Sequence, residues 1–210
     1  MLSCTIDLNN FQRTCGACKK CTSISKGAYF FNKDLKNSEQ LVDELEKLVE
    51  RGTPYHCADT TIHKNPDILV YDTDSKLVCR IEAKMLEDKP FMKVHDFLPG
   101  HDLFPKETIV VDKPKLESYI ARWKKDGGIP TYVVWHLGRP CADVGGITIF
   151  QDISVLYDIF QQQGEKRVFT RRTGIGDIKD GKKLGITEKY HFSISECRPI
   201  YELCNDICNL

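Results

Sequence analysis

The sequence lacks the features that mark membrane and secreted proteins. It has no run of about 18 apolar residues, so no membrane-spanning helix is expected. Its first ~25 residues contain no apolar stretch of the kind found in secretory signals, which favours a cytoplasmic protein. Its formal net charge is +0, which excludes a general electrostatic attraction to nucleic acid or to membrane surfaces.

Several catalytic signatures are missing as well. The chain has no glycine-rich phosphate loop followed by lysine, which excludes a P-loop ATPase. It has neither the H-E-x-x-H helix of zinc proteases nor the G-x-S-x-G turn of serine hydrolases. The paired H-x-E and P-C-x-x-C motifs of zinc deaminases are also absent.

The charges are unevenly placed although they sum to zero. Acidic residues outnumber basic ones over 34–74, and the reverse holds over 164–190. An acidic stretch can collect a metal ion and a basic one can bind a phosphate backbone, although either can also be ordinary solvated surface. With 41% hydrophobic residues, the chain can form a packed core.

Hydrophobic periodicity predicts alternating helices and strands. A stripe of leucines indicates a helix over about 38–51, which Asn37 is placed to cap. Two strand-like runs flank the turn residues 72–75 and predict a hairpin. The expected elements are helices at 38–51, 113–126 and 153–163, and strands at 67–71, 77–84, 131–137, 146–150, 167–170 and 189–195. This order predicts an α/β fold with a mixed central β-sheet flanked by helices.

The second strand of the hairpin carries charged residues on one face. Side chains alternate between faces along a strand, so Glu82 and Lys84 share a face opposite the apolar residues. Asp67 begins the partner strand, and pairing of the hairpin would bring it close to Glu82. Two carboxylates can bind Mg²⁺ through oxygen, and a lysine can stabilise charge that develops on a phosphate. The alternative is an ordinary surface hairpin with one charged face.

Pro66-Asp67 followed by Glu82-Ala83-Lys84 resembles the motif of the PD-(D/E)XK nuclease superfamily, which has the restriction-endonuclease-like fold. The resemblance covers about residues 38–150. It implies that Asp67, Glu82 and the Ala83 carbonyl bind Mg²⁺ or Mn²⁺ and that Lys84 is the catalytic lysine. It also implies DNA as the partner and is compatible with a homodimer.

Many members of that superfamily also carry a glutamate on the helix before the hairpin. Glu44 and Glu46 flank the apolar stripe of the expected helix, and we favour Glu44 as the additional catalytic residue. The alternative is that both glutamates only keep the helix surface soluble. Lys113 and Lys115 open the next helix and could neutralise phosphates near the site.

A cysteine cluster indicates a second metal site. Cys15-Gly-Ala-Cys18-Lys-Lys-Cys21 places three thiols at metal-ligand spacing, with Cys4 as the favoured fourth ligand. Other candidates for the fourth ligand are Cys57, Cys197, Cys204 and Cys208. Zn²⁺ is the simplest metal, an iron–sulfur cluster is the alternative, and unligated or redox-active thiols remain a third reading.

These observations predict two parts of the chain. Residues 1–33 form a small Cys-rich metal-binding appendage, which 197–210 would join if the termini meet. Residues 34–196 form the nuclease-like α/β domain. The expected function is hydrolysis of DNA phosphodiester bonds through a Mg²⁺-activated water. The alternatives are a non-cleaving nucleic-acid-binding or assembly module on the same fold, and a zinc or iron–sulfur sensor.

Overall fold

The computed structural model describes residues 2–15, 28–60, 66–87, 91–98, 102–139, 141, 143–170, 178–179, 182–183 and 188–210. Within these ranges no helix is both long enough and apolar enough to cross a membrane.

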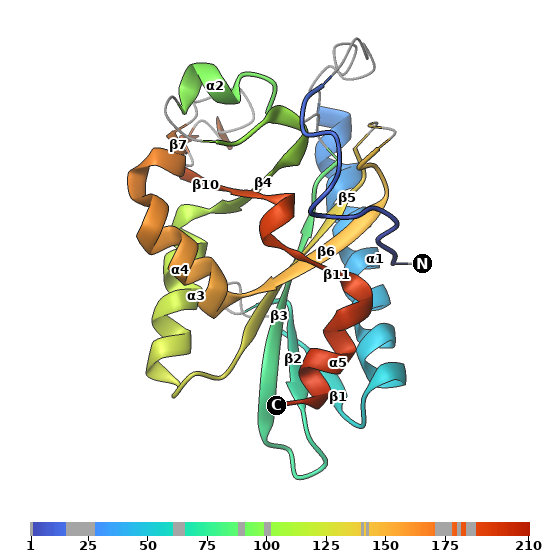
Figure 1. Cartoon of the computed structure of the whole chain (residues 1–210). Coiled ribbons are helices and arrows are strands. Elements are labelled where there is room, and N and C mark those ends of the chain that lie inside the picture. The colour runs from blue at the N-terminus through green and yellow to red at the C-terminus, as the bar shows by residue number, and fades with distance from the viewer. Residues whose placement is uncertain are drawn as a thin grey trace.

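The predicted mixed sheet is confirmed. Six strands lie in the order β1-β2-β3-β5-β6-β11, and only β3 and β5 run parallel (Figure 1). Their bounds are β1 His56–Asp59, β2 Ile68–Tyr71, β3 Leu77–Met85, β5 Thr131–Leu137, β6 Ile147–Asp152 and β11 Arg198–Pro199. The parallel pair requires a long connection, which the segment between β3 and β5 supplies.

A second, antiparallel sheet has the order β4-β10-β7. Its bounds are β4 Thr108–Asp112, β7 Val168–Thr170 and β10 Glu188–Ser193, and a separate short ribbon pairs β8 Ile178–Lys179 with β9 Lys182–Lys183. The α-helices are α1 Ala28–Gly52, α2 Val94–Phe97, α3 Lys113–Lys125, α4 Ile153–Gln163 and α5 Leu203–Cys208. Short 3₁₀ turns are Pro105–Glu107, Gly164–Arg167, Ile194–Glu196 and Ile200–Glu202.

The β2–β3 hairpin forms as the sequence predicts. The Asp72 carboxylate accepts hydrogen bonds from the backbone N–H groups of Asp74 and Lys76, at 2.9 and 2.8 Å, which closes the turn. Ile68 pairs with Ile81, so the next residues outward, Asp67 and Glu82, lie side by side. The pairing of the hairpin therefore places the Asp67 carboxylate beside the Glu82 carboxylate.

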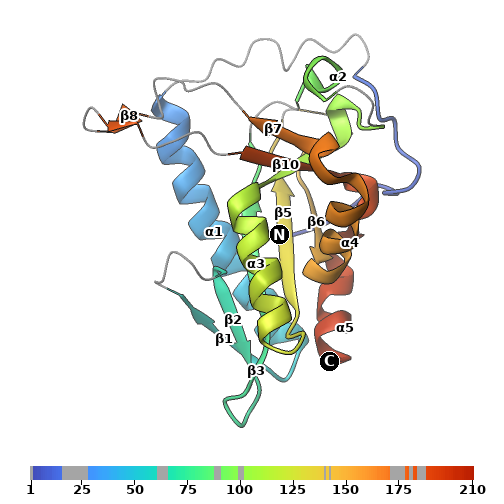
Figure 2. The ribbon, with the colours of Figure 1, turned by 90° about the vertical axis from the view of Figure 1, so that its left-hand side faces the viewer.

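Helices cover both faces of the main sheet (Figure 2). On one face, Leu41, Leu45 and Val49 of α1 pack against residues of β2 and β3, including Ile68 and Ile81. On the other face, α3 and α4 form a second hydrophobic core with β5, β6 and the second sheet. Alternate side chains of β3 consequently point into two different environments.

Helix α1 begins earlier than predicted. It starts at Ala28, so Asn37 lies inside the helix rather than at its N-cap, and the Asn37 side chain instead donates a hydrogen bond to Glu87. No glycine or proline interrupts 28–37, so nothing in the backbone chemistry stops the helix at residue 37. The N-cap prediction was wrong for this reason.

The C-terminal residues belong to the core of the α/β unit. Ile200, Leu203 and Ile207 are buried in the same cluster as α1 and the β2–β3 hairpin. The Cys204 thiol lies against the Leu48 carbonyl and the Cys208 thiol against the Gly52 carbonyl, both at the end of α1. The division into 1–33 and 34–196 stays a prediction.

Candidate active site

Asp67, Glu82 and Lys84 meet where the β2–β3 hairpin faces α3. The Asp67 carboxylate accepts a hydrogen bond from the Ala83 backbone N–H at 2.7 Å. Glu82 and Lys84 share one face of β3, and the Lys84 ammonium donates to Glu82 Oε1. The structure thus brings together the three residues at the centre of the sequence prediction.

The Glu82 carboxylate is fully buried and surrounded by donors. Its Oε1 oxygen accepts from Lys84 and, at 3.3 Å, from the Lys115 ammonium of α3. Its Oε2 oxygen accepts from the Tyr119 hydroxyl at 2.5 Å. A buried carboxylate needs such partners because desolvation of an uncompensated charge costs several kcal/mol, on the order of 3–5 when one partner of a buried pair is removed.

Burial and mutual repulsion act on the two carboxylates. Burial raises the pKa of Asp67, the negative charge of Glu82 raises it further, and the Ala83 N–H and the two lysines oppose the shift. Two close carboxylates in a desolvated place favour the entry of a cation. The two carboxylates therefore disfavour each other's charge, and Lys84 and Lys115 offset part of that repulsion.

The donors of α3 keep their protons. Burial is the largest influence on Lys115 and lowers its pKa, but the charges of Glu82 and Asp67 outweigh it, so the pKa is raised overall. Burial, followed by the Glu82 charge, raises the pKa of the Tyr119 hydroxyl. At neutral pH, Lys115 is a cation and Tyr119 is a hydrogen-bond donor.

The available metal ligands are hard oxygen donors. Asp67, Glu82 and the Ala83 carbonyl would supply them, with water completing the shell, and such a set suits Mg²⁺ or Mn²⁺. Among the described residues, no group of three or more His, Cys, Asp or Glu side chains is placed to hold a metal ion. The donor set fits a divalent ion bound by two carboxylates.

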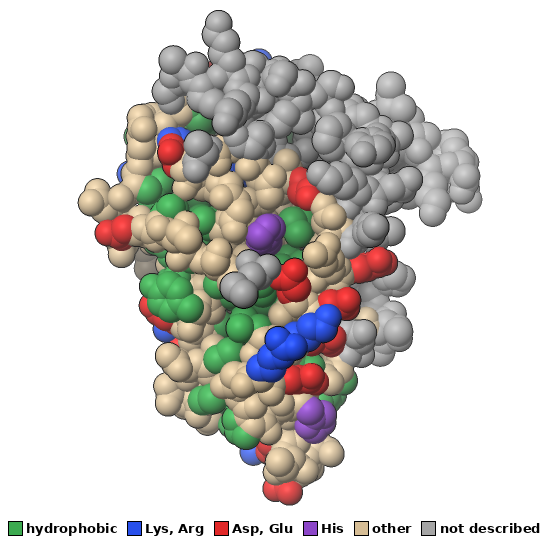
Figure 3. All heavy atoms as spheres, turned by 90° about the vertical axis from the view of Figure 1, so that its right-hand side faces the viewer, with side chains coloured by type: hydrophobic (Ala, Val, Ile, Leu, Met, Phe, Trp, Pro, Cys, Tyr) green, Lys and Arg blue, Asp and Glu red, His purple; other side chains and the backbone are tan. Residues whose placement is uncertain are grey.

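The structure does not bring Glu44 to this site. Glu44 lines a hollow of about 120 Å³ together with Met85 and His136. Met85 follows Lys84 on β3 and pairs with His136, so this hollow opens on the α1 side of the sheet. Figure 3 shows the side of the molecule that carries α1 and α5, where acidic side chains gather. A catalytic role for Glu44 stays a prediction, without support from this placement.

The predicted cysteine site falls largely outside the described residues, since Cys18 and Cys21 are not among them. The Cys4 thiol donates to the Ile6 carbonyl, and the Cys15 sulfur lies 4.0 Å from the sulfur of Met92. No cysteine metal site is present in the part of the chain that is described. Zinc and its iron–sulfur alternative stay predictions.

Sequence reasoning missed Tyr119. It lies in the predicted helix at 113–126 beside the buried Leu116 and Ile120, and its own ring is buried. The signal that could have found it is spacing, since Lys115 and Tyr119 are four residues apart and thus share a helix face. Lys113, the other predicted phosphate contact, instead pairs with Glu165 and Glu188.

Two of the described basic residues of 164–190 are engaged in ion pairs, and Lys166 is exposed. Arg167 is buried and its guanidinium pairs with Glu196 at 2.8 Å, while Lys189 pairs with Asp112. The remaining five basic residues of this stretch have no described side chains: Arg171, Arg172, Lys179, Lys182 and Lys183. A role for the stretch in binding DNA stays a prediction.

Comparison with solved structures returns similar folds, two of which are described here. No protein-family model and no curated protein matches the sequence. One similar structure is Hjc, a Holliday junction resolvase from the archaeal hyperthermophile Archaeoglobus fulgidus, with 13% identity, a TM-score of 0.42, and coverage of 80% of this chain and 96% of that chain. Another is D212, a nuclease from a fusselovirus, with 12% identity, a TM-score of 0.46, and coverage of 89% and 95%. At this level of similarity, the functional interpretation rests on the geometry of Asp67, Glu82 and Lys84.

Proposed function

We propose that this protein is a Mg²⁺-dependent nuclease that hydrolyses phosphodiester bonds of DNA. One observation carries the proposal. The half-buried Asp67 and the buried Glu82 lie side by side, and the Lys84 ammonium donates a hydrogen bond to the Glu82 carboxylate. Paired carboxylates with an adjacent lysine suit hydrolysis at a phosphate, where negative charge must be bound and a water activated.

Each residue has a distinct part in the proposed reaction. Asp67, Glu82 and the Ala83 carbonyl would hold the divalent ion, which polarises the phosphate and makes a bound water more acidic when it is present. The Lys84 ammonium would donate to the non-bridging phosphate oxygens as their negative charge grows. The Tyr119 hydroxyl holds one oxygen of Glu82 and thereby orients the other toward the reaction.

A non-cleaving DNA-binding module is the second candidate. The observation in its favour is that Lys84 and Lys115 already neutralise Glu82 within the protein. If this internal pairing were never displaced, the site would bind phosphate through its lysines without hydrolysis.

A cleavage assay separates the two candidates. Purified protein is incubated with linear duplex, supercoiled, single-stranded and four-way-junction DNA in Mg²⁺, Mn²⁺ or EDTA, beside Asp67→Ala and Lys84→Ala. We expect metal-dependent cutting by the wild type that both variants lose. DNA binding without cutting in any metal would support the second candidate and reject the first. Cutting of RNA but not DNA would correct the substrate.

The same site predicts how metal stabilises the fold. Asp67→Asn keeps an acceptor for the Ala83 N–H but removes a charge that burial and Glu82 disfavour. In EDTA at neutral pH, we therefore expect its melting temperature to equal or exceed that of the wild type. Wild-type protein should gain about 2.7 kcal/mol of stability when Mg²⁺ is at 100 times its Kd, and the variant should gain little. Equal stabilisation of both proteins by Mg²⁺ would place the metal elsewhere.

Oligomeric state belongs to the proposal as well. Cutting both strands of a duplex in a single binding event requires two sites of this kind, which a homodimer would supply. Light scattering of the protein with and without duplex DNA measures the mass directly. A monomer that makes double-strand breaks in a single binding event would contradict the proposal of a homodimer.

A further inference from the structure

Two ammonium groups share one oxygen of Glu82. Lys84, on the same strand, and Lys115, from the first turns of α3, both donate to Oε1, while Tyr119 occupies Oε2. Figure 2 shows α3 running alongside β5 and β3 on one face of the main sheet. Oε1 is therefore the oxygen left for a metal ion, and it is also the oxygen that both lysines hold.

The Lys84 and Lys115 side chains differ in solvent exposure and therefore in how easily each can move away from Glu82. The Lys84 side chain is 19% exposed, whereas the Lys115 side chain is 43% exposed. Lysine carries its charge at the end of a flexible four-carbon chain, so an exposed one can turn away from its partner. Lys115 can move toward solvent without any change in the position of α3.

The lysine ammonium groups and a divalent ion would compete for the Glu82 carboxylate. Without metal, the buried carboxylate needs cations close by, and Lys84 and Lys115 supply them. A divalent ion bound to the same oxygen would repel both ammonium groups at short range. The more exposed ammonium is then displaced, and a DNA phosphate beside the site is the strongest acceptor within reach.

We propose that Lys115 is an exchangeable cation, which occupies the metal-binding oxygen of Glu82 in the metal-free protein and transfers to the DNA phosphate when metal binds. Tyr119 is a positioning residue in this arrangement, because it keeps Oε2 engaged and presents Oε1 to whichever cation is bound. This inference rests on the proposed nuclease function and adds a regulated exchange to it. It predicts that loss of Lys115 has opposite effects on metal binding and on cutting.

Direct metal binding tests the exchange. Mn²⁺ affinity is measured by calorimetry and by electron paramagnetic resonance of free Mn²⁺, without DNA, for the wild type, Lys115→Met and Tyr119→Phe. We expect Lys115→Met to bind Mn²⁺ about tenfold more tightly, because a competing charge is gone. Tyr119→Phe keeps the buried ring and should bind Mn²⁺ severalfold more weakly. Lys113→Met is the matched control, since Lys113 lies on the same helix but pairs with Glu165 and Glu188.

DNA measurements complete the test. At saturating Mn²⁺, single-turnover cutting by Lys115→Met should fall about tenfold or more, and binding to duplex DNA in Ca²⁺ should weaken. Unchanged or weaker Mn²⁺ affinity in Lys115→Met would overturn the exchange even if the wild type cuts DNA. A wild type that neither binds Mn²⁺ at Asp67 and Glu82 nor cuts would instead overturn the proposed function. The two failures are therefore distinguishable.

Discussion

Replacing Lys84 by methionine should lower the rate of single-turnover DNA cutting by about a hundredfold to a thousandfold, the usual effect of losing one charge-stabilising donor. Methionine keeps an unbranched apolar side chain of nearly the same length but removes the ammonium that donates to Glu82. Since Lys84 is proposed to act on charge that grows in the transition state, the loss should appear in the maximal rate rather than in the DNA concentration needed for half-saturation.

Lys76→Met is the matched control for this prediction. Lys76 lies in the turn of the same hairpin, before the start of β3, and its side chain is exposed. Rapid-quench measurements at saturating Mg²⁺ give both rates. Cutting by Lys84→Met at the rate of Lys76→Met would show that Lys84 has no part in the reaction, and the assigned roles would have to be withdrawn.

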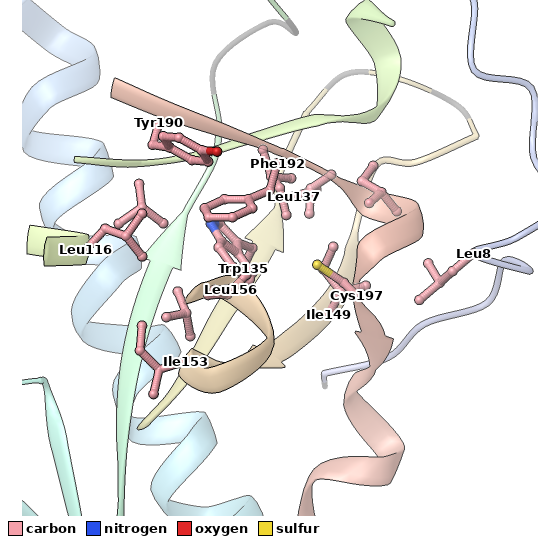
Figure 4. Packing of buried hydrophobic residues seen from close by; sticks show 14 of the residues in the cluster. Leu8, Leu116, Trp135, Leu137, Ile149, Ile153, Leu156, Tyr190, Phe192 and Cys197 are labelled. Carbon is pink, nitrogen blue, oxygen red and sulfur yellow. The ribbon is translucent and has the colours of Figure 1, made fainter. Parts of the chain in front are cut away.

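Trp135→Ala should lower the free energy of unfolding by about 3–5 kcal/mol, as expected for a large buried ring. Trp135 is completely buried in the core on the α3 side of the sheet (Figure 4). Its ring lies against Phe192 of β10, and its indole N–H donates to the Val110 carbonyl of β4 at 3.1 Å. This side chain joins the second sheet to the main sheet, so its removal weakens both.

Denaturant unfolding followed by circular dichroism checks this effect. Trp135→Phe should lose less stability than Trp135→Ala, because it refills much of the cavity and leaves only the Val110 carbonyl without its donor. Val155→Ala on the exposed side of α4 should change stability by less than about 0.5 kcal/mol. A loss of under 1 kcal/mol for Trp135→Ala would contradict the role assigned to this packing.

The part of the site on the β2–β3 hairpin could be predicted because its determinants are local. The turn at Asp72 and the alternation along β3 fix which side chains share a face, and the pairing then places Asp67 beside Glu82. Two-residue periodicity is read directly from the sequence. The mixed sheet followed from the same strand patterns.

The contacts that α3 makes with Glu82 could not be predicted from the sequence, because they depend on how a helix distant in the chain packs on the sheet. Tyr119 has the pattern of a core residue, and only the approach of α3 to β3 gives its hydroxyl a carboxylate partner. Glu44 shows the converse case. Its helix packs on the opposite face of β3, a choice of side that helical periodicity does not encode.

The C-terminal segment illustrates a third limit. The cysteines near the end of the chain are candidates for the fourth ligand of the cysteine site, which stays a prediction, and Cys204 and Cys208 lie on α5 against the carbonyl groups at the end of α1. The apolar residues between and before them complete the core beneath that helix, with Leu203 and Ile207 fully buried. The packing of α5 against α1 joins residues far apart in the chain, and the spacing of the cysteines does not reveal it.

The position of the metal ion tests the central claim most directly. Crystals of the protein soaked in Mn²⁺ and measured near the manganese absorption edge give an anomalous difference map that locates the ion without reference to activity. We predict a peak bound by the carboxylates of Asp67 and Glu82 and by the Ala83 carbonyl, which disappears in Asp67→Asn. A protein that cuts DNA in Mn²⁺ but shows no ion at these residues would contradict the account.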